Sequence, residues 1–316
     1  NLSLVMSAPN PLERLREVIR LAIRNLDSVI DVNYYPSDRA SNSNFKHRPI
    51  GLGVMGYYEW LVKQGVDFES EEHLKQADAL FEAISYFAIE ASADLAQERG
   101  SYPSFEGSNW SKGILPIDNA KLMEDGKPFF DQPRRFDWEA LREKVKKGMR
   151  NSNLMAIAPT ATISNIAGTT QCTEPPFLLE FLKSNLGGTY QVVDPAIKHI
   201  GDRYHLLKEA YYTDQLYIIK AAAVRQKWID QSQSTNLFAK QGTTGRDLDL
   251  WYTTAKKLGL KTTYYLRNQS DAEKSASMRT KVIAELANAA LGKLSEPTES
   301  APKMCSILDP DCESCQ

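Results

Sequence analysis

Three short segments of this chain hold residues that could carry chemistry. The first is Ala158-Pro159-Thr160-Ala161-Thr162-Ile163-Ser164-Asn165, where small hydroxyl residues follow an apolar run and open an expected helix. Backbone N–H groups and hydroxyls at such a turn can bind an anion such as a phosphate. An ordinary helix N-cap after a strand has the same pattern, and the residues alone leave both interpretations open.

The second segment is the pair Tyr264-Tyr265 within the strand-like run Lys261 to Leu266. On a regular strand two adjacent side chains point to opposite faces, and β-propensity alone accounts for two tyrosines. The alternative is a pair of phenols that passes an electron and a proton along a chain. The spacing does not choose between them.

The third segment is Cys312-Glu313-Ser314-Cys315, behind a linker rich in Pro and Ser. Two thiols at this spacing can close a small disulfide loop and exchange with another disulfide. A metal site would need two more ligands, of which the tail offers only Cys305, so we predict no metal site in this chain. A redox shuttle and a fortuitous pair both remain open.

The glycines Gly51, Gly53 and Gly56 have the spacing of a dinucleotide-binding turn. That turn requires a buried strand before it and a second strand with an acidic end about 20 residues later. Here polar residues precede the glycines and another helix begins near Glu69. We therefore reject a Rossmann turn and expect these glycines to allow close backbone packing.

The composition excludes several functional classes. The 316 residues carry 38 basic and 40 acidic side chains without a basic stripe, which argues against direct binding to nucleic acid. No apolar run approaches the roughly 20 residues of a membrane span, and the start at Asn1 lacks a secretory leader, so we expect a cytoplasmic protein. Four cysteines are too few for a disulfide scaffold and suggest thiol chemistry.

Hydrophobic periodicity and capping residues predict a helix-rich α/β fold. Helices are expected over 11–31, 57–63, 71–99, 139–147, 214–230 and 247–258. Short strands are expected over 155–158, 232–238 and 261–266, whereas 36–46 and 120–135 have turn-rich or irregular composition. We expect one folded unit over 1–293 and a flexible tail over 294–316.

Several segments, in this order, resemble the large catalytic subunit of class I ribonucleotide reductase. They are Arg48-Pro49-Ile50-Gly51-Leu52-Gly53-Val54, Lys112-Gly113-Ile114-Leu115-Pro116-Ile117-Asp118, Asp137-Trp138, Arg150-Asn151-Ser152, Pro159-Thr160-Ala161-Thr162-Ile163-Ser164, Glu174-Pro175, Asp230-Gln231-Ser232, Tyr264-Tyr265 and the Cys312/Cys315 pair. The resemblance covers nearly the whole chain.

The resemblance implies the C-terminal part of a ten-stranded α/β barrel that reduces ribonucleoside diphosphates by thiyl-radical chemistry for DNA synthesis. It assigns the substrate's diphosphate to Thr160, Ala161, Thr162, Ile163 and Ser164. It makes Tyr264 and Tyr265 the end of a radical-transfer path, with Tyr265 nearer the small subunit and Tyr264 nearer the cysteine to be oxidised. Cys312 and Cys315 become the dithiol that re-reduces the active site and is itself reduced by thioredoxin or glutaredoxin.

The family's Asn-x-Cys-x-Glu segment, which supplies the radical cysteine, is absent from this sequence. The resemblance places it upstream of Asn1, in an N-terminal half that also holds the nucleotide effector sites. We therefore expect this chain to be inactive without that half, as a split-gene product, an intein product or a truncation. It should bind no cofactor itself, because the radical comes from a metal-containing small subunit. We interpret Cys172 as a buried structural thiol.

We expect the helix over 247–258 to help bind the tail of the small subunit through the apolar stripe Leu248, Trp251, Ala255 and Leu258.

Two other functions remain open. An adenosylcobalamin-dependent reductase would need no tyrosine relay to a partner, and a non-catalytic remnant that binds the partner subunits would need neither the turn at 159–164 nor the terminal thiols. A glycyl-radical enzyme is disfavoured, because the tail has no glycine for that radical.

Overall fold

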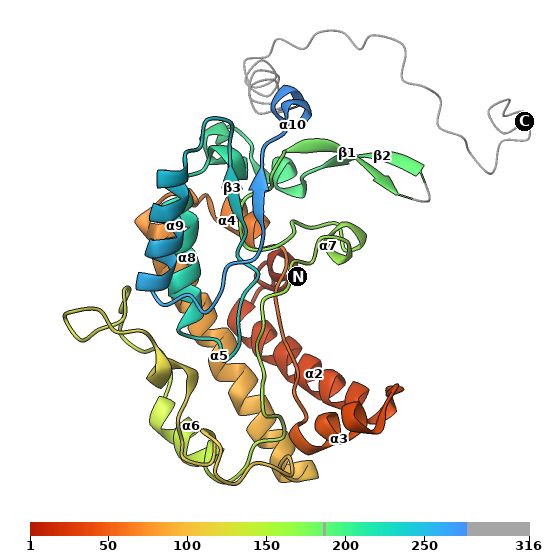
Figure 1. Cartoon of the computed structure of the whole chain (residues 1–316). Coiled ribbons are helices and arrows are strands. Elements are labelled where there is room, and N and C mark those ends of the chain that lie inside the picture. The colour runs from red at the N-terminus through yellow and green to blue at the C-terminus, as the bar shows by residue number, and fades with distance from the viewer. Residues whose placement is uncertain (186–187, 277–316) are drawn as a thin grey trace, which may run out of the picture.

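The computed structural model describes residues 1–185 and 188–276 (Figure 1). The predicted tail over 294–316, its boundary at 293 and the Cys312/Cys315 pair lie outside these residues. The α-helices are α1 (Leu2–Val5), α2 (Pro11–Val32), α3 (Asp38–His47), α4 (Tyr57–Gln64), α5 (Glu71–Arg99), α6 (Trp138–Val145), α7 (Ile163–Ile166), α8 (Gln215–Gln226), α9 (Gly245–Lys257) and α10 (Asp271–Ala276). The strands are β1 (Glu180–Asn185), β2 (Gly188–Val193), β3 (Leu237–Ala239) and β4 (Leu266–Asn268).

The two longest helices, α2 and α5, pack side by side (Figure 1). Helical spacing predicts an apolar stripe on α2 made of Leu12, Leu15, Ile19, Ala22, Leu26 and Val29. It is partly confirmed, since Leu15 and Ile19 are buried while Leu12 and Val29 are exposed. Ile23, which lies outside the predicted stripe, is also buried. Helix α5 spans 71–99 as predicted: Ser70 caps its start, with a hydroxyl that accepts from the His73 N–H at 3.2 Å, and Gly100 caps its end. Capping and periodicity therefore define this layer.

Most of the stretch over 36–46 belongs to α3, which spans Asp38–His47, so the prediction of a turn-rich loop is wrong there. The Ser37 hydroxyl caps α3 by accepting from the Ala40 N–H at 3.3 Å. The Phe45 ring packs against Tyr35 with 5.6 Å between centroids. The many polar residues concealed this helix, because it buries no residue fully and so lacks an apolar stripe.

Four extended segments run parallel and side by side, in chain order. Backbone hydrogen bonds join residues 50–52 to 153–156, 155–157 to 231–234, and 235–239 to 264–269. Helices fill the connections: α4, α5 and α6 the first, α7 and α8 the second, and α9 the third. Parallel strands with helical crossovers confirm the α/β class.

The third predicted strand is shifted along the chain. Residues over 261–266 were expected to be a strand, but β4 spans Leu266–Asn268, and Tyr264 and Tyr265 directly precede it. The antiparallel hairpin of β1 and β2, which pairs Glu180 with Val193, was not predicted (Figure 1). Its sequence does not alternate clearly between apolar and polar residues.

Several residues of the motifs that resemble the family make hydrogen bonds between the parallel segments. The Asp230 carboxylate accepts the N–H groups of Leu154 and Met155, both at 2.8 Å. The Gln231 side chain donates to the Ile50 carbonyl at 2.8 Å, so the Asp230-Gln231 pair joins three of the four parallel segments near their amino ends.

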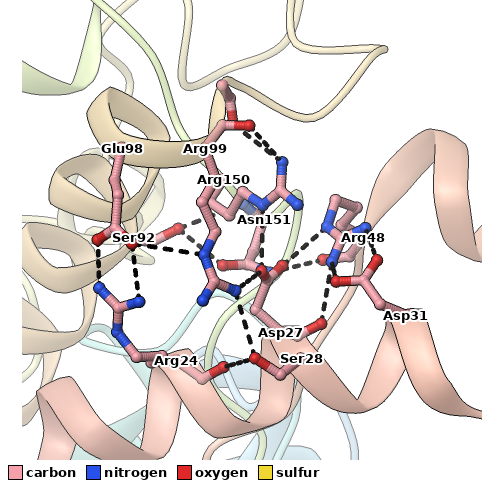
Figure 2. Close-up of polar contacts among 11 residues, drawn as sticks. Arg24, Asp27, Ser28, Asp31, Arg48, Ser92, Glu98, Arg99, Arg150 and Asn151 are labelled. Atoms are coloured by element: carbon pink, nitrogen blue, oxygen red, sulfur yellow. Dashed lines mark hydrogen bonds and ion pairs between the residues drawn. The ribbon is translucent and has the colours of Figure 1, made fainter.

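Figure 2 shows a second such cluster around the fully buried Asp27 of α2. Its carboxylate pairs with Arg48 at 2.8 Å and with Arg150 at 3.1 Å, and accepts from the Asn151 amide at 3.1 Å. Arg48 also binds Asp31 at 2.8 Å. The cluster ties α2 to the residues that precede the first two parallel segments, so these motif residues are structural.

No helix among the described residues is long and apolar enough to cross a membrane.

Candidate functional site

The predicted anion-binding turn leaves the second parallel segment at Pro159 and enters the single helical turn of α7. Ala161, Thr162 and Ile163 are exposed. Thr162 occupies the N-cap position but its side chain makes no capping hydrogen bond. The simple N-cap interpretation therefore does not account for that hydroxyl.

Ser164 differs from the rest of the turn. It is fully buried, and within the described part of the chain its hydroxyl oxygen has no hydrogen-bond partner. Its backbone N–H donates to the Thr160 carbonyl at 3.0 Å, which closes the turn. A buried hydroxyl without a partner calls for water or a ligand group.

A small cavity of about 80 Å³ lies between this turn and Tyr265. Its lining includes Pro159 and Ala161 from the turn and Tyr265 from the tyrosine pair. The remaining lining residues are Gln171, Cys172, Glu174, Pro175, Phe177, Asn236, Phe238 and Arg267. Two segments about a hundred residues apart in the sequence therefore reach one opening.

Cys172, which we predicted to be a buried structural thiol, is only half-buried and lies in the wall of this cavity. Its thiol donates to the Pro159 carbonyl at 2.8 Å, and its backbone N–H donates to the Thr160 hydroxyl at 3.0 Å. Burial, together with the neighbouring Glu174 carboxylate, raises the pKa of the Cys172 thiol. The group is therefore a hydrogen-bond donor at neutral pH rather than a nucleophile.

Glu174 is nearly completely buried beside Cys172, and burial raises the pKa of its carboxyl. One oxygen accepts the Asn236 N–H at 2.9 Å, while the other has no hydrogen-bond partner among the described residues. Arg225 of α8 is also fully buried, and its charge opposes the rise in the pKa of Glu174. The Glu174 carboxyl in the cavity wall therefore keeps its proton to a higher pH than an exposed glutamate does.

Tyr264 and Tyr265 are about half exposed and do not point to opposite faces as on a regular strand. Their rings lie 4.0 Å apart between centroids, and their hydroxyls are hydrogen-bonded at 3.1 Å. This hydrogen bond raises the pKa of Tyr264. The pair has the geometry that transfer of a proton between two phenols requires.

Asn236 and Arg267 were not predicted as site residues. Arg267 follows Tyr265 by two positions, a spacing that places two side chains on the same face of a strand, so periodicity could have indicated it. Its guanidinium lies 5.2 Å from the Phe177 ring centroid. Asn236 lies within the predicted strand over 232–238, but nothing in its local sequence indicates that it faces a cavity.

The stripe predicted on the helix over 247–258 contributes to the core. Ala255 of α9 is buried, and Trp251 and Leu258 pack with it against Ile219 and Leu237. The more exposed apolar side chains of α9 are Leu250 and Tyr252. Much of the predicted docking stripe is therefore not free for a partner.

A larger cavity of about 560 Å³ opens at the other end of the parallel segments, near Ser152, Asp230 and Lys261. It holds none of the predicted site residues. Among residues 1–185 and 188–276 no group of three or more His, Cys, Asp or Glu side chains is arranged to hold a metal ion.

The chain matches the family model described as ribonucleotide reductase, barrel domain, over residues 1–266. It is 47% identical over 287 residues to the ribonucleoside-diphosphate reductase subunit alpha of Helicobacter pylori strain J99, covering 88% of this chain and 36% of that protein. The corresponding subunit of Chlamydia trachomatis is 41% identical over 345 residues, covering 96% and 33%. The large chain 2 of Saccharomyces cerevisiae is 38% identical over 318 residues, covering 91% and 35%. The chain thus spans about a third of the length of these relatives.

Proposed function

The chain belongs to the ribonucleotide reductase barrel-domain family, and from this premise we propose that it supplies part of the active site of a cytoplasmic ribonucleoside-diphosphate reductase. The reaction replaces the 2′-hydroxyl of a ribonucleoside diphosphate by hydrogen. The observation that carries the proposal is the cavity lined by both the turn after Pro159 and Tyr265.

The turn would bind the diphosphate through Thr160, Ala161, Thr162, Ile163 and Ser164. Three features support this role: exposed first-turn positions, a threonine hydroxyl not used for capping, and the buried Ser164 hydroxyl without a partner in the described residues. Amides at the start of a helix and hydroxyls together are a common way to bind phosphate oxygens.

Tyr264 and Tyr265 would carry the radical toward the reactive cysteine. The 3.1 Å hydrogen bond between their hydroxyls gives the proton a direct path when the electron moves from one phenol to the other. The raised pKa of Tyr264 keeps this phenol protonated at neutral pH, so it can give up a proton together with an electron. The exposure of Tyr265 suits an entry point facing a partner subunit.

Other parts of the reaction would come from elsewhere. None of the four cysteines stands in an Asn-x-Cys-x-Glu segment, so we propose that another segment of the large subunit supplies the radical cysteine. A metal-containing small subunit would generate the radical, and nucleotide effectors would bind outside this chain. Cys312 and Cys315 would re-reduce the active site and be reduced by thioredoxin or glutaredoxin. The four parallel segments would form part of the ten-stranded barrel.

The direct test is reconstitution. The chain is co-expressed with the remaining large-subunit sequence and the small subunit of the same organism, and reduction of cytidine diphosphate is measured. We expect dithiol-dependent turnover that is absent when this chain is omitted. Lack of turnover with all components present and folded would favour the non-catalytic remnant.

The hydrogen-bonded tyrosine pair favours a class I enzyme over an adenosylcobalamin-dependent one, which would need no such relay. Turnover that requires added adenosylcobalamin and no small subunit would reverse this choice.

A further inference from the structure

Cys172 is hydrogen-bonded to the same turn that the proposed function assigns to the substrate's diphosphate. Its thiol and its backbone N–H reach Pro159 and Thr160, which lie 13 and 12 residues earlier in the chain. These two hydrogen bonds therefore restrain Pro159 and Thr160, at the beginning of the turn, from a residue that is not itself part of the turn. Asn236, on the third parallel segment, places its amide nitrogen 3.9 Å from the Cys172 sulfur and links this contact to the sheet.

The backbone at this point is in a conformation that side chains disfavour. Thr160 has φ of 54° and Cys172 has φ of 55°, both in the left-handed region. For a β-branched residue such as threonine this conformation is a genuine outlier. It persists only where surrounding contacts enforce it, and such positions gather at ligand-binding sites.

An independent observation indicates that the adjoining cavity suits a polar ligand group. Glu174 is 2% exposed and lines the cavity beside Cys172, and one of its oxygens has no hydrogen-bond partner within the described ranges. A buried carboxyl oxygen left in this state is unfavourable, so native proteins usually satisfy it with water or a ligand group.

We propose that Cys172 is a positioning residue for the substrate's diphosphate, because its thiol hydrogen and backbone N–H fix Pro159 and Thr160 in the binding conformation before the ligand arrives. This inference rests on the proposed function, since it requires the turn to be the diphosphate site. A turn that is already ordered loses less conformational entropy when it binds, so the ligand binds more tightly. The thiol keeps the hydrogen that it donates, since burial opposes its ionisation.

The test uses the reconstituted enzyme with Cys172→Ala and Cys172→Ser. Alanine removes the thiol's hydrogen bond to Pro159, while serine restores a donor at nearly the same place. For cytidine diphosphate we expect alanine to raise KM and Kd roughly three- to tenfold, the value of one neutral hydrogen bond, with kcat within about twofold. Serine should return both constants to within about twofold of wild type.

The inference is overturned if the alanine variant binds cytidine diphosphate like the wild type, or if serine is as impaired as alanine. Should Cys172→Ala not fold, Cys172→Gly also removes the thiol donor at a φ of 55° that glycine readily adopts, and it should weaken binding in the same range; unchanged binding would overturn the inference. A wild-type enzyme that neither binds nor reduces the nucleotide would overturn the proposed function itself. The two failures are therefore distinguishable.

Discussion

At the scale of single residues, the local environment separates groups that react from groups that only hold structure. Cys172 has a half-buried thiol that donates to a carbonyl, and its raised pKa leaves almost no thiolate at neutral pH. Tyr264 and Tyr265 are exposed and hydrogen-bonded to each other. The same cavity therefore brings together a sulfur held as a donor and a phenol able to exchange a proton.

We expect Cys172 to react slowly with iodoacetamide in the folded protein, because the thiolate is the reactive form. Since the pKa is raised, the rate should stay low through neutral pH and rise only in strongly alkaline solution. Peptide mass spectrometry measures the rate for this cysteine, and the same cysteine in the urea-unfolded chain is the control. Equal rates in the folded and unfolded chains would contradict the raised pKa.

Replacing Tyr264 with Phe should abolish turnover in the reconstituted enzyme, because phenylalanine has no phenolic proton to transfer and is much harder to oxidise. Loss of a relay member should reduce kcat by at least about a hundredfold, in the range of removing an essential proton-transfer group. Tyr34→Phe is the matched control, since Tyr34 is 86% exposed and far from the tyrosine pair in the sequence. Full activity of the Tyr264 variant would exclude the relay.

At the scale of elements, the cluster around Asp27 in Figure 2 holds α2 against the beginnings of two parallel segments. Asp27→Ala should lower the free energy of unfolding by about 3–5 kcal/mol, because Arg48 is left buried without one of its partners. Denaturant unfolding monitored by circular dichroism measures the loss. Glu98→Ala, which removes an exposed ion pair to Arg24 in the same view, is the control and should unfold close to wild type. Equal stability of Asp27→Ala and wild type would show that the cluster does not hold α2.

Sequence patterns predicted those elements whose signals are local. Ser70 and Gly100 delimit α5, and Asp214 caps α8 by accepting from the Leu216 N–H at 2.9 Å. Helix α3 was missed because its contacts are made by a few side chains rather than by a continuous apolar stripe. The hairpin of β1 and β2 was missed because strand formation there depends on contacts between the two strands, which neither strand's own sequence pattern reveals.

The candidate site was predictable in part for the same reason. The hydroxyls of Thr160, Thr162 and Ser164 and the tyrosine pair could be recognised from their types and order. The hydrogen bonds from Cys172 to Pro159 and Thr160 could not be predicted, since they depend on a left-handed backbone conformation at Thr160 and at Cys172. Nor could the contact of the two phenols be predicted, because a regular strand would separate them.

At the scale of the whole molecule, the four parallel segments separate two kinds of motif. Asp230-Gln231 and the Asp27 cluster with Arg48 and Asn151 lie at the amino ends and make structural hydrogen bonds. Pro159, Asn236 and Arg267 lie further along their segments and line the cavity. In parallel α/β sheets ligands bind beyond the carboxyl ends of the strands, so this division is what a binding site at that end requires.

The stability of the whole protein should also depend on Asp194, a buried carboxyl that follows β2. Its side chain accepts the Ala196 N–H at 3.0 Å, and burial, with a smaller effect of Glu59, raises the pKa of Asp194 from 3.8 to about 7. Between these values the folded state binds a proton that the unfolded state has lost. The free energy of unfolding should therefore fall as pH rises from 4 to 7, by about 1.4 kcal/mol for each pKa unit.

Asp194→Asn should remove this contribution, because asparagine keeps the acceptor for Ala196 and does not ionise. We expect the variant to match wild type near pH 4 and to exceed it in stability at pH 8, as measured by urea unfolding at each pH. Carboxyls with lowered pKa values, such as Asp31 and Asp118, make both proteins less stable as the pH falls toward their pKa values, so the difference between the proteins isolates Asp194. Asp202→Asn, at an exposed position, is the control and should follow wild type. Parallel pH profiles for Asp194→Asn and wild type would show that this carboxyl is ionised in the folded protein at neutral pH.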